Sequence, residues 1–417
     1  MSDETPPTLL FVGGARAVAM STDMALQALG QARARGIHTY VTNAQEALLA
    51  TPAVVAAAGA TAPVSFLPAG ETVEWARNQV GSGHRIDAVF ALQEMAQVTV
   101  AETAQALGAV GNPVEAVHRV RTKDIGRAAL AAAGFAQPAV RLCADQADAE
   151  DFLRSGTGPW IVKPRDAMGS IGVSQVFDTA GLPAALDLLP GTAPFLVEEF
   201  VDGPEYSVEG IFLDGRPVIL AVTEKEKVDP PYFVEIAHAL PADLPPGRQE
   251  EIEHTVTAAL RELGLRAGGF HVELWLTRDG VVLGEVHTRF GGDFIHTMLA
   301  HAIPGLELFG QVFDDLLGRR DRPGPLTPTR GAAVRYLAPP PGRIEAVHGW
   351  DEVREHPAVL YSELNAGPGD VVPALHRSAD RIGLIVVGAE TTAQAKQLAI
   401  KLTESIRFDI AADAHTE

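Results

Sequence analysis

The sequence contains a single cysteine, Cys143, among 417 residues. One cysteine cannot form a disulfide within the chain, and it excludes a metal site built from several thiolates. The chain also lacks an apolar run that is long enough to span a membrane. Its first residues, Met1–Glu4, carry no basic segment, so we expect no signal peptide and a cytoplasmic location.

Positive charge is scarce, with 33 Lys and Arg against 53 Asp and Glu and a net charge of −20. Such a charge opposes attraction to nucleic-acid phosphates and to anionic membrane surfaces. We therefore expect neither a nucleic-acid nor a membrane partner. A local cluster of lysine and arginine around a small anion is still compatible with this composition, because a binding site depends on the groups near it.

The length exceeds what one hydrophobic core usually supports, so we expect two or three packed domains. Residues 1–110 are predicted to form an open parallel α/β domain. Leu9–Val12, Ile37–Val41 and Asp87–Leu92 are apolar runs typical of buried strands, and Ser21–Arg35 between the first two is typical of a helix.

Residues 111–320 have a different pattern, which predicts an α+β domain. An alanine-rich helix is expected from about Arg119, and short strands separated by glycine turns follow it. The proline- and glycine-rich segment Arg322–Pro328 predicts a linker. Residues 321–417 are then expected to form a C-terminal β-rich lobe.

The segment His271–His287 alternates apolar and polar residues around an Asp-Gly turn and predicts a β-hairpin. A three-residue loop at 278–280, with Gly280 in the left-handed conformation, would place Glu273 directly opposite Glu285. Two facing carboxylates repel each other unless a cation lies between them, and hard oxygen ligands suit Mg²⁺. The alternative is a solvated face with ordinary surface acids, and this segment alone favours neither interpretation.

The end of this hairpin carries further candidate site residues. Glu285, His287 and Arg289 fall on one face of the strand, and a tight turn containing Gly291 and Gly292 follows. Arg289 could stabilise the negative charge that develops during acyl or phosphoryl transfer. The alternative is a salt bridge between Arg289 and the same glutamates.

Lys163 is expected at the end of a strand, and the loop that follows contains Gly169, Ser170 and Gly172. Glycines let backbone N–H groups approach phosphate oxygens, and lysine adds a compact positive charge. The loop is not a Walker A sequence, because no G-K-[ST] begins a helix there. The alternative is an ordinary Gly-Ser turn between strands.

The segment Phe195–Glu209 predicts a strand, a turn and a second strand. Its apolar part could form one wall of an adenine site, with backbone groups bonded to the base and a nearby carboxylate bonded to the ribose. The alternative is a hairpin with solvated acids.

The order of these motifs resembles the ATP-grasp superfamily. The segments that carry the resemblance are Arg121–Lys123, Val162–Pro164, Gly169-Ser170, Glu198–Glu205, Glu273 and Glu285. The resemblance covers about residues 110–320 closely and the flanking parts more loosely. It implies an ATP-grasp fold with an N-terminal open parallel α/β domain like that of biotin carboxylase and a C-terminal β-rich lobe.

The resemblance also implies ATP and Mg²⁺ as cofactors, with Mn²⁺ as an alternative metal. By position, the implied nucleotide-binding residues are Lys123, Lys163, Gly169, Ser170, Glu198, Glu199, Val201 and Glu205. The implied metal ligands are Glu273, Glu285 and His287. Many family members have asparagine where this chain has His287, but neutral imidazole can also bind a metal.

The stretch Thr223–His238 resembles the corresponding region of bacterial L-amino acid ligases. This shorter resemblance implies that Lys225 lies near the nucleotide or the acyl phosphate and that Glu235 lies near an amino group. For His238 we expect a structural hydrogen bond. The implied catalytic residues are Arg289 and Lys225, and the implied substrate-binding residues are Glu235, Arg289, Gly291 and Gly292.

The activity implied by the resemblance is an ATP-dependent carboxylate–amine ligase that acts on a small carboxylic acid and an amine through an acyl phosphate. Amino acids are the preferred substrates in this interpretation, an unusual amine of specialised metabolism fits equally well, and a homodimer is the family expectation. The alternatives are a purine-biosynthesis or biotin-carboxylase-type enzyme and a nucleotide-binding regulatory protein without turnover. The regulatory protein is disfavoured because both metal carboxylates, both lysines and Arg289 are present.

Overall fold

The structure is a computed structural model that describes residues 6–166, 169–191, 194–228, 232–320 and 324–411. Of the expected features, Met1–Glu4, residues 322 and 323 of the linker, and residues 167–168 and 229–231 within two motifs lie outside the described residues. Within these ranges, no helix has the length and apolar character needed to cross a membrane.

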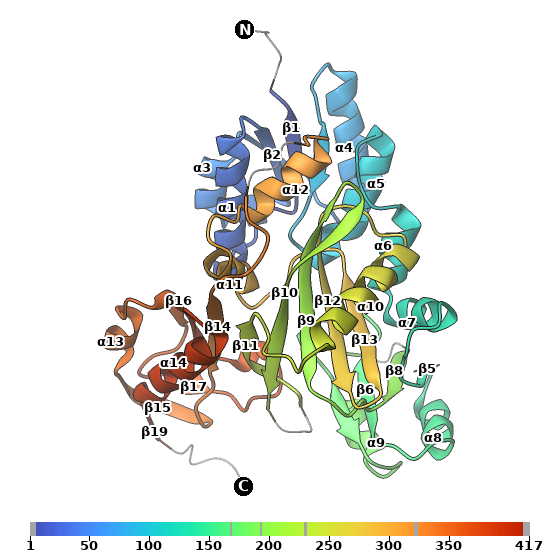
Figure 1. Ribbon diagram of the computed structural model, residues 1–417, viewed down its shortest axis with the longest axis vertical. Helices are drawn as coiled ribbons and strands as arrows, with labels where there is room; N and C mark the ends of the chain where they lie inside the picture. Colours follow the sequence, from blue (N-terminus) through green and yellow to red (C-terminus); the bar gives the residue numbers. More distant parts are fainter. Residues whose placement is uncertain (1–5, 167–168, 192–193, 229–231, 321–323, 412–417) are drawn as a thin grey trace.

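The N-terminal part is built on a four-stranded parallel sheet with the strand order β3-β2-β1-β4, at the top of Figure 1. β1 is buried along its whole length, as expected for an apolar strand in a covered parallel sheet. The expected open parallel α/β fold is thus confirmed. The elements are β1 (Thr8–Val12), α1 (Ala19–Ala34), β2 (His38–Asn43), α2 (Gln45–Leu49), α3 (Pro52–Ala57), β3 (Ala60–Pro63), α4 (Ala69–Gly81), β4 (Ala88–Phe90), the 3-10 helix η1 (Glu94–Ala96) and α5 (Gln97–Leu107).

The central part contains a small antiparallel sheet with the order β5-β8-β6-β7. It has its own hydrophobic core, in which Phe152, Trp160 and Phe195 are buried. Two short helices pack on it, and they supply part of this core. The elements are β5 (Val140–Cys143), α8 (Gln146–Arg154), β6 (Trp160–Pro164), β7 (Ser174–Val176), α9 (Leu182–Asp187) and β8 (Phe195–Glu199).

An eight-stranded antiparallel sheet, β13-β12-β9-β10-β11-β14-β18-β16, runs through the middle of the molecule. Its last three strands in this order follow residue 320, so one sheet joins the central and C-terminal parts. Helix α10 (Arg248–Glu262) covers one face of its first half, where Ile252 and Val256 share a core with Val272 and Leu283. The strands are β9 (Glu205–Leu213), β10 (Arg216–Lys227), β11 (Glu235–Leu240), β12 (Gly269–Thr277), β13 (Gly280–His287), β14 (Gly331–Leu337), β16 (Val359–Leu364) and β18 (Gly383–Ala389).

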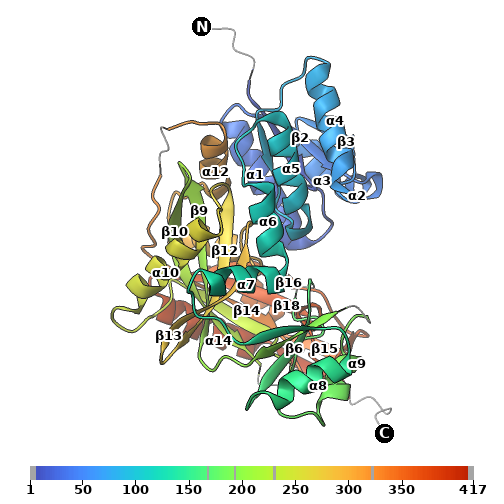
Figure 2. The ribbon, with the colours of Figure 1, turned by 90° about the vertical axis from the view of Figure 1, so that its right-hand side faces the viewer.

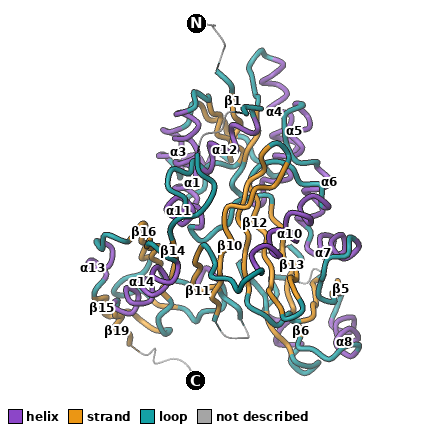
Figure 3. Tube along the Cα trace, in the orientation of Figure 1, coloured by secondary structure: helices purple, strands orange, loops and turns teal. Residues whose placement is uncertain are grey.

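The C-terminal part adds a three-stranded antiparallel sheet with the order β17-β15-β19, which lies at the lower left of Figure 1. Strands fill the middle of the molecule, and most helices lie around them (Figure 3). The remaining elements are α11 (Ile295–Ala302), α12 (Leu308–Leu316), β15 (Gly342–His348), α13 (Trp350–Arg354), β17 (Val371–Val372), the 3-10 helix η2 (Ser378–Asp380), α14 (Thr392–Ser405) and β19 (Arg407–Ala411).

The single alanine-rich helix expected from Arg119 is wrong. The structure has two helices, α6 (Val114–Arg121) and α7 (Lys123–Ala132), which run in different directions in Figure 2. Thr122 between them has extended backbone angles (φ −105°, ψ 105°), which interrupt the helix. The break makes Lys123 the first residue of α7.

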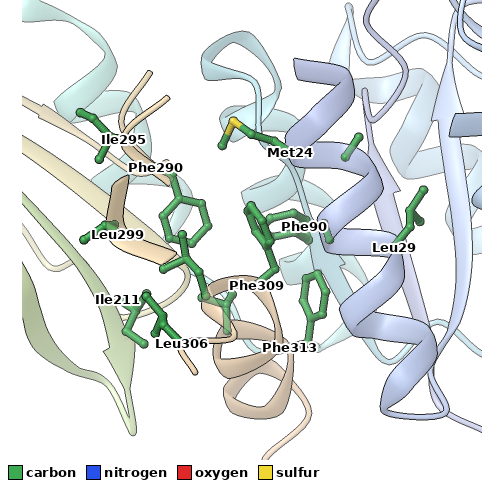
Figure 4. Close-up of a cluster of buried hydrophobic side chains, with 14 of the residues drawn as sticks. Met24, Leu29, Phe90, Ile211, Phe290, Ile295, Leu299, Leu306, Phe309 and Phe313 are labelled. Atoms are coloured by element: carbon green, nitrogen blue, oxygen red, sulfur yellow. The ribbon is translucent and has the colours of Figure 1, made fainter. Parts of the chain in front are cut away.

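An aromatic core joins the N-terminal part to the rest of the chain. Phe309 of α12 lies between Phe90 of β4 and Phe290, and Phe313 of the same helix packs against Phe90 (Figure 4). The ring centres of Phe90 and Phe313 are 5.1 Å apart, and those of Phe290 and Phe309 are 5.4 Å apart. Phe290 directly follows Arg289, so this core also fixes the segment that carries Arg289.

We predict that Phe309→Ala destabilises the protein by about 3–5 kcal/mol, because it removes a fully buried ring and leaves a cavity. The urea midpoint of unfolding, followed by circular dichroism, should fall clearly below that of the wild type. Phe177→Ala is the matched control, since the Phe177 side chain is 72% exposed and its removal should cost less than about 0.5 kcal/mol. Equal midpoints for the two variants would contradict the role of this core.

Candidate active site

A cleft of about 200 Å³ lies between the small sheet and one face of the large sheet. Of the residues expected from the sequence, Lys225, Gly291 and Gly292 do not line it, whereas all the others do. The lining residues are Lys123, Ile161, Lys163, Pro164, Gly169, Ser170, Ile171, Val173, Glu198, Glu199, Phe200, Val201, Glu205, Lys227, Phe233, Glu235, Glu273, Trp275, Glu285, His287 and Arg289.

β12 and β13 form the expected hairpin, but its loop is shorter than expected. Thr277 pairs with Gly280, so the loop consists of Arg278 and Asp279 alone. The Thr277 hydroxyl donates a hydrogen bond to the Gly280 carbonyl and accepts one from the Asp279 N–H. These bonds close a two-residue loop, and the three-residue prediction is therefore wrong.

A β-bulge at Gly284 and Glu285 restores the register farther along the hairpin, where His271 pairs with His287. Glu273 thus lies against Gly284 and next to Glu285 instead of being paired with a single residue. Glycine is needed at 284, because a Cβ there would lie 2.9 Å from the Glu273 carbonyl oxygen. A bulge shifts the alternation of side chains, and here Glu273, Glu285 and His287 all reach the cleft.

The Glu198 carboxylate binds two cations at the wall of the cleft. Its oxygens lie 2.9 Å from Lys163 Nζ and 2.5 Å from Arg127 Nε. Burial raises the pKa of Glu198, but the two positive charges outweigh burial and lower that pKa to about 2. Glu285, at the cleft, is more loosely paired, with Lys123 Nζ at 3.5 Å and Lys163 Nζ at 3.7 Å.

Lys225 lies behind the cleft, at the centre of three carboxylates. Its ammonium nitrogen is 2.7 Å from Glu205, 2.9 Å from Glu273 and 3.1 Å from Glu235. Burial lowers the pKa of Lys225, but the three carboxylates together raise it well above its usual value. Lys227 also binds Glu205. The ammonium of Lys225 therefore holds these three acids together.

A second bulge brings Glu235 into this group. β10 and β11 pair Lys225 with His238, but Lys227 pairs with Glu235 because the register shifts after Glu226. Glu235 and His238 consequently lie on the same face of the sheet although they are three residues apart. His238 Nε2 is 2.9 Å from an Asp293 oxygen, which is the structural hydrogen bond expected for this histidine.

Glu94 of the N-terminal part contacts two arginines and a histidine at the edge of the cleft. Its oxygens lie 2.7 Å from Arg289 Nε, 2.9 Å from Arg121 and 3.0 Å from His287 Nδ1. Burial raises the pKa of Glu94, but these charges outweigh burial and hold it well below its usual range. The contact with Nδ1 leaves His287 Nε2 directed toward Glu285, at 3.6 Å. Arg289 thus pairs with Glu94. The alternative, a salt bridge between Arg289 and the glutamates of the hairpin, is therefore wrong.

A buried histidine supports Glu273 from below. His271 Nδ1 is 2.9 Å from Glu209, and its Nε2 is 3.4 Å from Glu273. The Ser207 hydroxyl also donates to Glu209. Gly291 covers this pair, since a Cβ at that position would lie 2.9 Å from a Glu209 oxygen. Gly291 therefore has a packing role beside the cleft.

The expected phosphate loop and the expected adenine-binding segment both border the cleft. Ser170 has a positive φ of 58° and Gly172 one of 67°, so the loop turns sharply at the cleft. Glu199 ends β8, and its carboxylate accepts a hydrogen bond from the Ala139 N–H at 3.4 Å. The backbone of Val201 follows at the cleft wall.

The carboxylates of the cleft fit a hard divalent cation. Glu273 and Glu285 project from adjacent strands, and each keeps about a quarter of its side chain exposed. Oxygens of Glu205, Glu235 and Glu273 also lie within 4.8 Å of one another, but the ammonium of Lys225 already lies among them. Carboxylate oxygens suit Mg²⁺ better than a soft metal.

Several residues of the site were missed by sequence reasoning. Glu94, Glu209 and Arg381 were not singled out, and Arg127 was noted only as part of a helix. Glu94 lies 193 residues before His287, and no local pattern connects them. Arg127 carried a weak signal, because it lies four residues after Lys123 and so on the same side of α7.

We predict that the His271–Glu209 pair stabilises the protein below about pH 6.5 and loses this effect as the pH rises toward 9. Burial lowers the pKa of His271, but Glu209 and Glu273 raise it above the ordinary 6.5, to about 9. A raised folded-state pKa contributes stability while the histidine is protonated in both states. The difference in unfolding free energy between wild type and His271→Gln, measured at pH 6, 8 and 9.5, should shrink stepwise. A difference independent of pH would contradict the charged pair.

Two family models match the chain. The model for the ATP-grasp domain matches residues 157–297, and the model for L-amino acid ligase C-terminal domain 2 matches residues 335–411. The first match covers the cleft from the small sheet to the Gly291-Gly292 turn. The second covers most of the C-terminal part.

Individual proteins show the same likeness. The chain is 27% identical over 350 residues to the uncharacterized protein y4rH of Sinorhizobium fredii, with 82% of this chain and 72% of that protein covered. It is 28% identical over 237 residues to alanine–anticapsin ligase of Bacillus amyloliquefaciens, with 50% of this chain and 49% of that protein covered. The chain thus spans about half the length of that ligase.

The crystal structure of L-amino acid ligase from Bacillus licheniformis has the same fold, with a TM-score of 0.80, 21% sequence identity, and 98% of this chain and 100% of that chain covered. The ATP-grasp fold expected from the sequence is thereby confirmed. The two domain matches and this fold show that the chain carries an ATP-grasp domain and is similar to the bacterial L-amino acid ligases, which supports an ATP-dependent carboxylate–amine ligase.

Proposed function

We propose that this enzyme uses ATP and Mg²⁺ to activate an amino acid as an acyl phosphate and joins it to the amino group of a second amino acid. The observation that carries the proposal is the convergence of Lys123, Lys163 and Arg289 with Glu273 and Glu285 in one cleft. Such a set can bind a triphosphate, a divalent cation and a charged reaction centre together.

In this proposal the nucleotide lies between the small sheet and the large sheet. Lys123 and Lys163 bind its phosphates, and the Gly169-Ser170 loop covers them. The loose distances of both lysines to Glu285 support this role, because phosphate oxygens can replace such contacts. Backbone groups of Glu198, Glu199 and Val201 would bind adenine. Glu205 would bind the ribose while its carboxylate also contacts Lys225.

Glu273 and Glu285, with His287 beside them, would hold Mg²⁺. Bound Mg²⁺ supplies a divalent charge that offsets the charge of the phosphate oxygens. His271 beneath Glu273, and Glu94 behind His287, fix the orientation of these side chains. Orienting contacts of this kind increase the precision of a ligand set.

The first chemical step is attack by a carboxylate oxygen of the acid on the γ-phosphorus of ATP. The bond from this phosphorus to the bridging oxygen breaks, which yields ADP and an acyl phosphate. Arg289 faces this step with its charge held in place by Glu94, and a preorganised cation stabilises developing negative charge without reorientation.

In the second step the amine nitrogen attacks the acyl carbon, the carbon–oxygen bond to phosphate breaks, and inorganic phosphate leaves. The neutral amine loses one proton as the amide forms, and the released phosphate carries this proton as HPO4²⁻. Glu235 would accept a hydrogen bond from the amino group, and Lys225 holds the Glu235 carboxylate in place. Closure of the loop would exclude water, which would otherwise hydrolyse the acyl phosphate.

Amino acids are proposed as substrates for two reasons. The C-terminal part matches an L-amino acid ligase domain, and a carboxylate, Glu235, is available for an ammonium group in the same cleft as the phosphate-binding cations. The test is phosphate release from MgATP with amino acids supplied singly and in pairs, together with product masses. We expect release that requires two amino acids and a product mass equal to their sum less water.

A panel in which no pair stimulates phosphate release would contradict the amino acid substrates. Release with one amino acid and bicarbonate or a sugar phosphate would point instead to a carboxylase or a purine-type ligase. Phosphate release without any acceptor would indicate that water is not excluded.

We also predict that Lys163→Met raises the Kd of a nonhydrolysable MgATP analogue about tenfold or more, since contacts between charged groups contribute roughly 1.5–3 kcal/mol each. The variant should fold, because Arg127 still pairs with Glu198 when Lys163 is absent. Lys401→Met on the exposed face of α14 is the matched control and should leave the Kd unchanged. Calorimetric titration gives both values, and an unchanged Kd for Lys163→Met would remove this lysine from the nucleotide site.

A further inference from the structure

A short segment of the C-terminal part, residues 376–381, lies against the cleft. It contains η2 and ends at Arg381, before β18. The ring of His376 lies 4.4 Å from that of Tyr232, centre to centre. The segment therefore contacts Tyr232, which precedes β11.

Arg381 is bound on every side although it carries a full charge. Its guanidinium stacks on the Tyr336 ring at 3.5 Å and binds Asp293 at 3.1 and 3.2 Å. It also donates to the backbone carbonyl of Glu235 at 2.9 Å. Only 9% of its side chain is exposed. Glu235 is thus held at its carboxylate by Lys225 and at its carbonyl by Arg381.

Ser378, near the middle of the same segment, contacts the phosphate loop. The Ser378 N–H donates to the Gly169 carbonyl at 3.3 Å. Arg381 Nε in turn donates to the Ser378 carbonyl at 2.8 Å. One continuous chain of contacts therefore runs from Gly169 through Ser378 and Arg381 to Glu235.

We propose that Ser378 and Arg381 are positioning residues that couple the phosphate loop to the substrate-binding carboxylate Glu235. A nucleotide that fixes Gly169, in the loop between β6 and β7, then also fixes Glu235 of β11. The inference rests on the proposed binding of nucleotide in the cleft. The C-terminal part would thus take part in substrate binding, because its Arg381 holds Glu235 in position.

Arginine is required at 381 because its planar guanidinium donates in several directions at once. Lysine could keep an ion pair with Asp293, but it could not also hold the carbonyls of Ser378 and Glu235. The hydrogen bonds of Ser378 to Gly169 and to Arg381 Nε do not involve Asp293. A change of the Ser378 N–H should therefore leave the contact between Arg381 and Asp293 intact. This separation makes the two ends of the chain of contacts testable one at a time.

The experiment is hydrogen–deuterium exchange of the full chain with and without the ATP analogue AMP-PNP and Mg²⁺. In the wild type we expect the analogue to slow exchange severalfold in three segments, residues 169–173, 376–382 and 235–240. In Ser378→Pro, which lacks the donor N–H, slowing should remain in 169–173 and disappear from the other two. Arg377 before it is extended (φ −151°, ψ 163°), as the residue before a proline should be, and residue 378 is the first residue of η2, where proline is tolerated.

Ser378→Ala is the matched control, because it keeps the N–H and should respond as the wild type does. Arg381→Lys is the second variant, in which slowing should reach 376–380 but not 235–240. Retention of all three responses in Ser378→Pro would overturn the inference, because the nucleotide would then act on Glu235 directly. A wild type that binds the analogue but responds only at 169–173 would also overturn it.

Failure of the wild type to bind AMP-PNP at all would overturn the proposed function and this inference together. Binding with intact ligase activity, but without any response of 376–382, would overturn the inference alone. The two failures are therefore distinguishable.

Discussion

Buried carboxylates that are neutralised by cations from distant parts of the chain determine the shape of the cleft. Glu198 is bound by Lys163 and Arg127, Glu94 by Arg121, His287 and Arg289, and three further acids surround Lys225. Removing charges from water is costly unless partners and geometry compensate, and loss of one partner leaves the other uncompensated. Each of these groups can therefore adopt few arrangements. The result is a rigid cleft in which Glu273, Glu285 and Arg289 are presented in fixed directions, as a transferring phosphoryl group would require.

Two β-bulges give the large sheet its functional face. A regular strand alternates its side chains, so Glu235 and His238 could not share a face, and Glu285 could not face the cleft while Leu283 and Val286 both enter the core. The bulge at Gly284 and the one beside Lys227 remove this restriction. Each bulge lies next to a carboxylate of the cleft. The backbone irregularity and the chemistry of the site are thus parts of one arrangement.

The sequence predicted those features that depend on neighbouring residues. Apolar runs gave the parallel N-terminal sheet, and alternation with an Asp-Gly turn gave the β12–β13 hairpin. The loop length was wrong because a bulge at Gly284 changes the pairing without changing the local pattern. Glu94 and Arg381 were missed for a different reason: Glu94 contacts His287, which is 193 residues away, and Arg381 contacts Asp293, which is 88 residues away, so no local pattern connects either pair.

The central claim is that the cleft activates a carboxylate by phosphorylation. Amino acids labelled with ¹⁸O in their carboxylates test this most directly, with the released inorganic phosphate analysed by mass spectrometry. Attack of the carboxylate on the γ-phosphorus, followed by release of phosphate from the acyl carbon, transfers one carboxylate oxygen to phosphate, so we predict one ¹⁸O in each phosphate released with product. Phosphate that contains no ¹⁸O, formed together with a ligated product, would contradict an acyl phosphate and with it the account of the cleft.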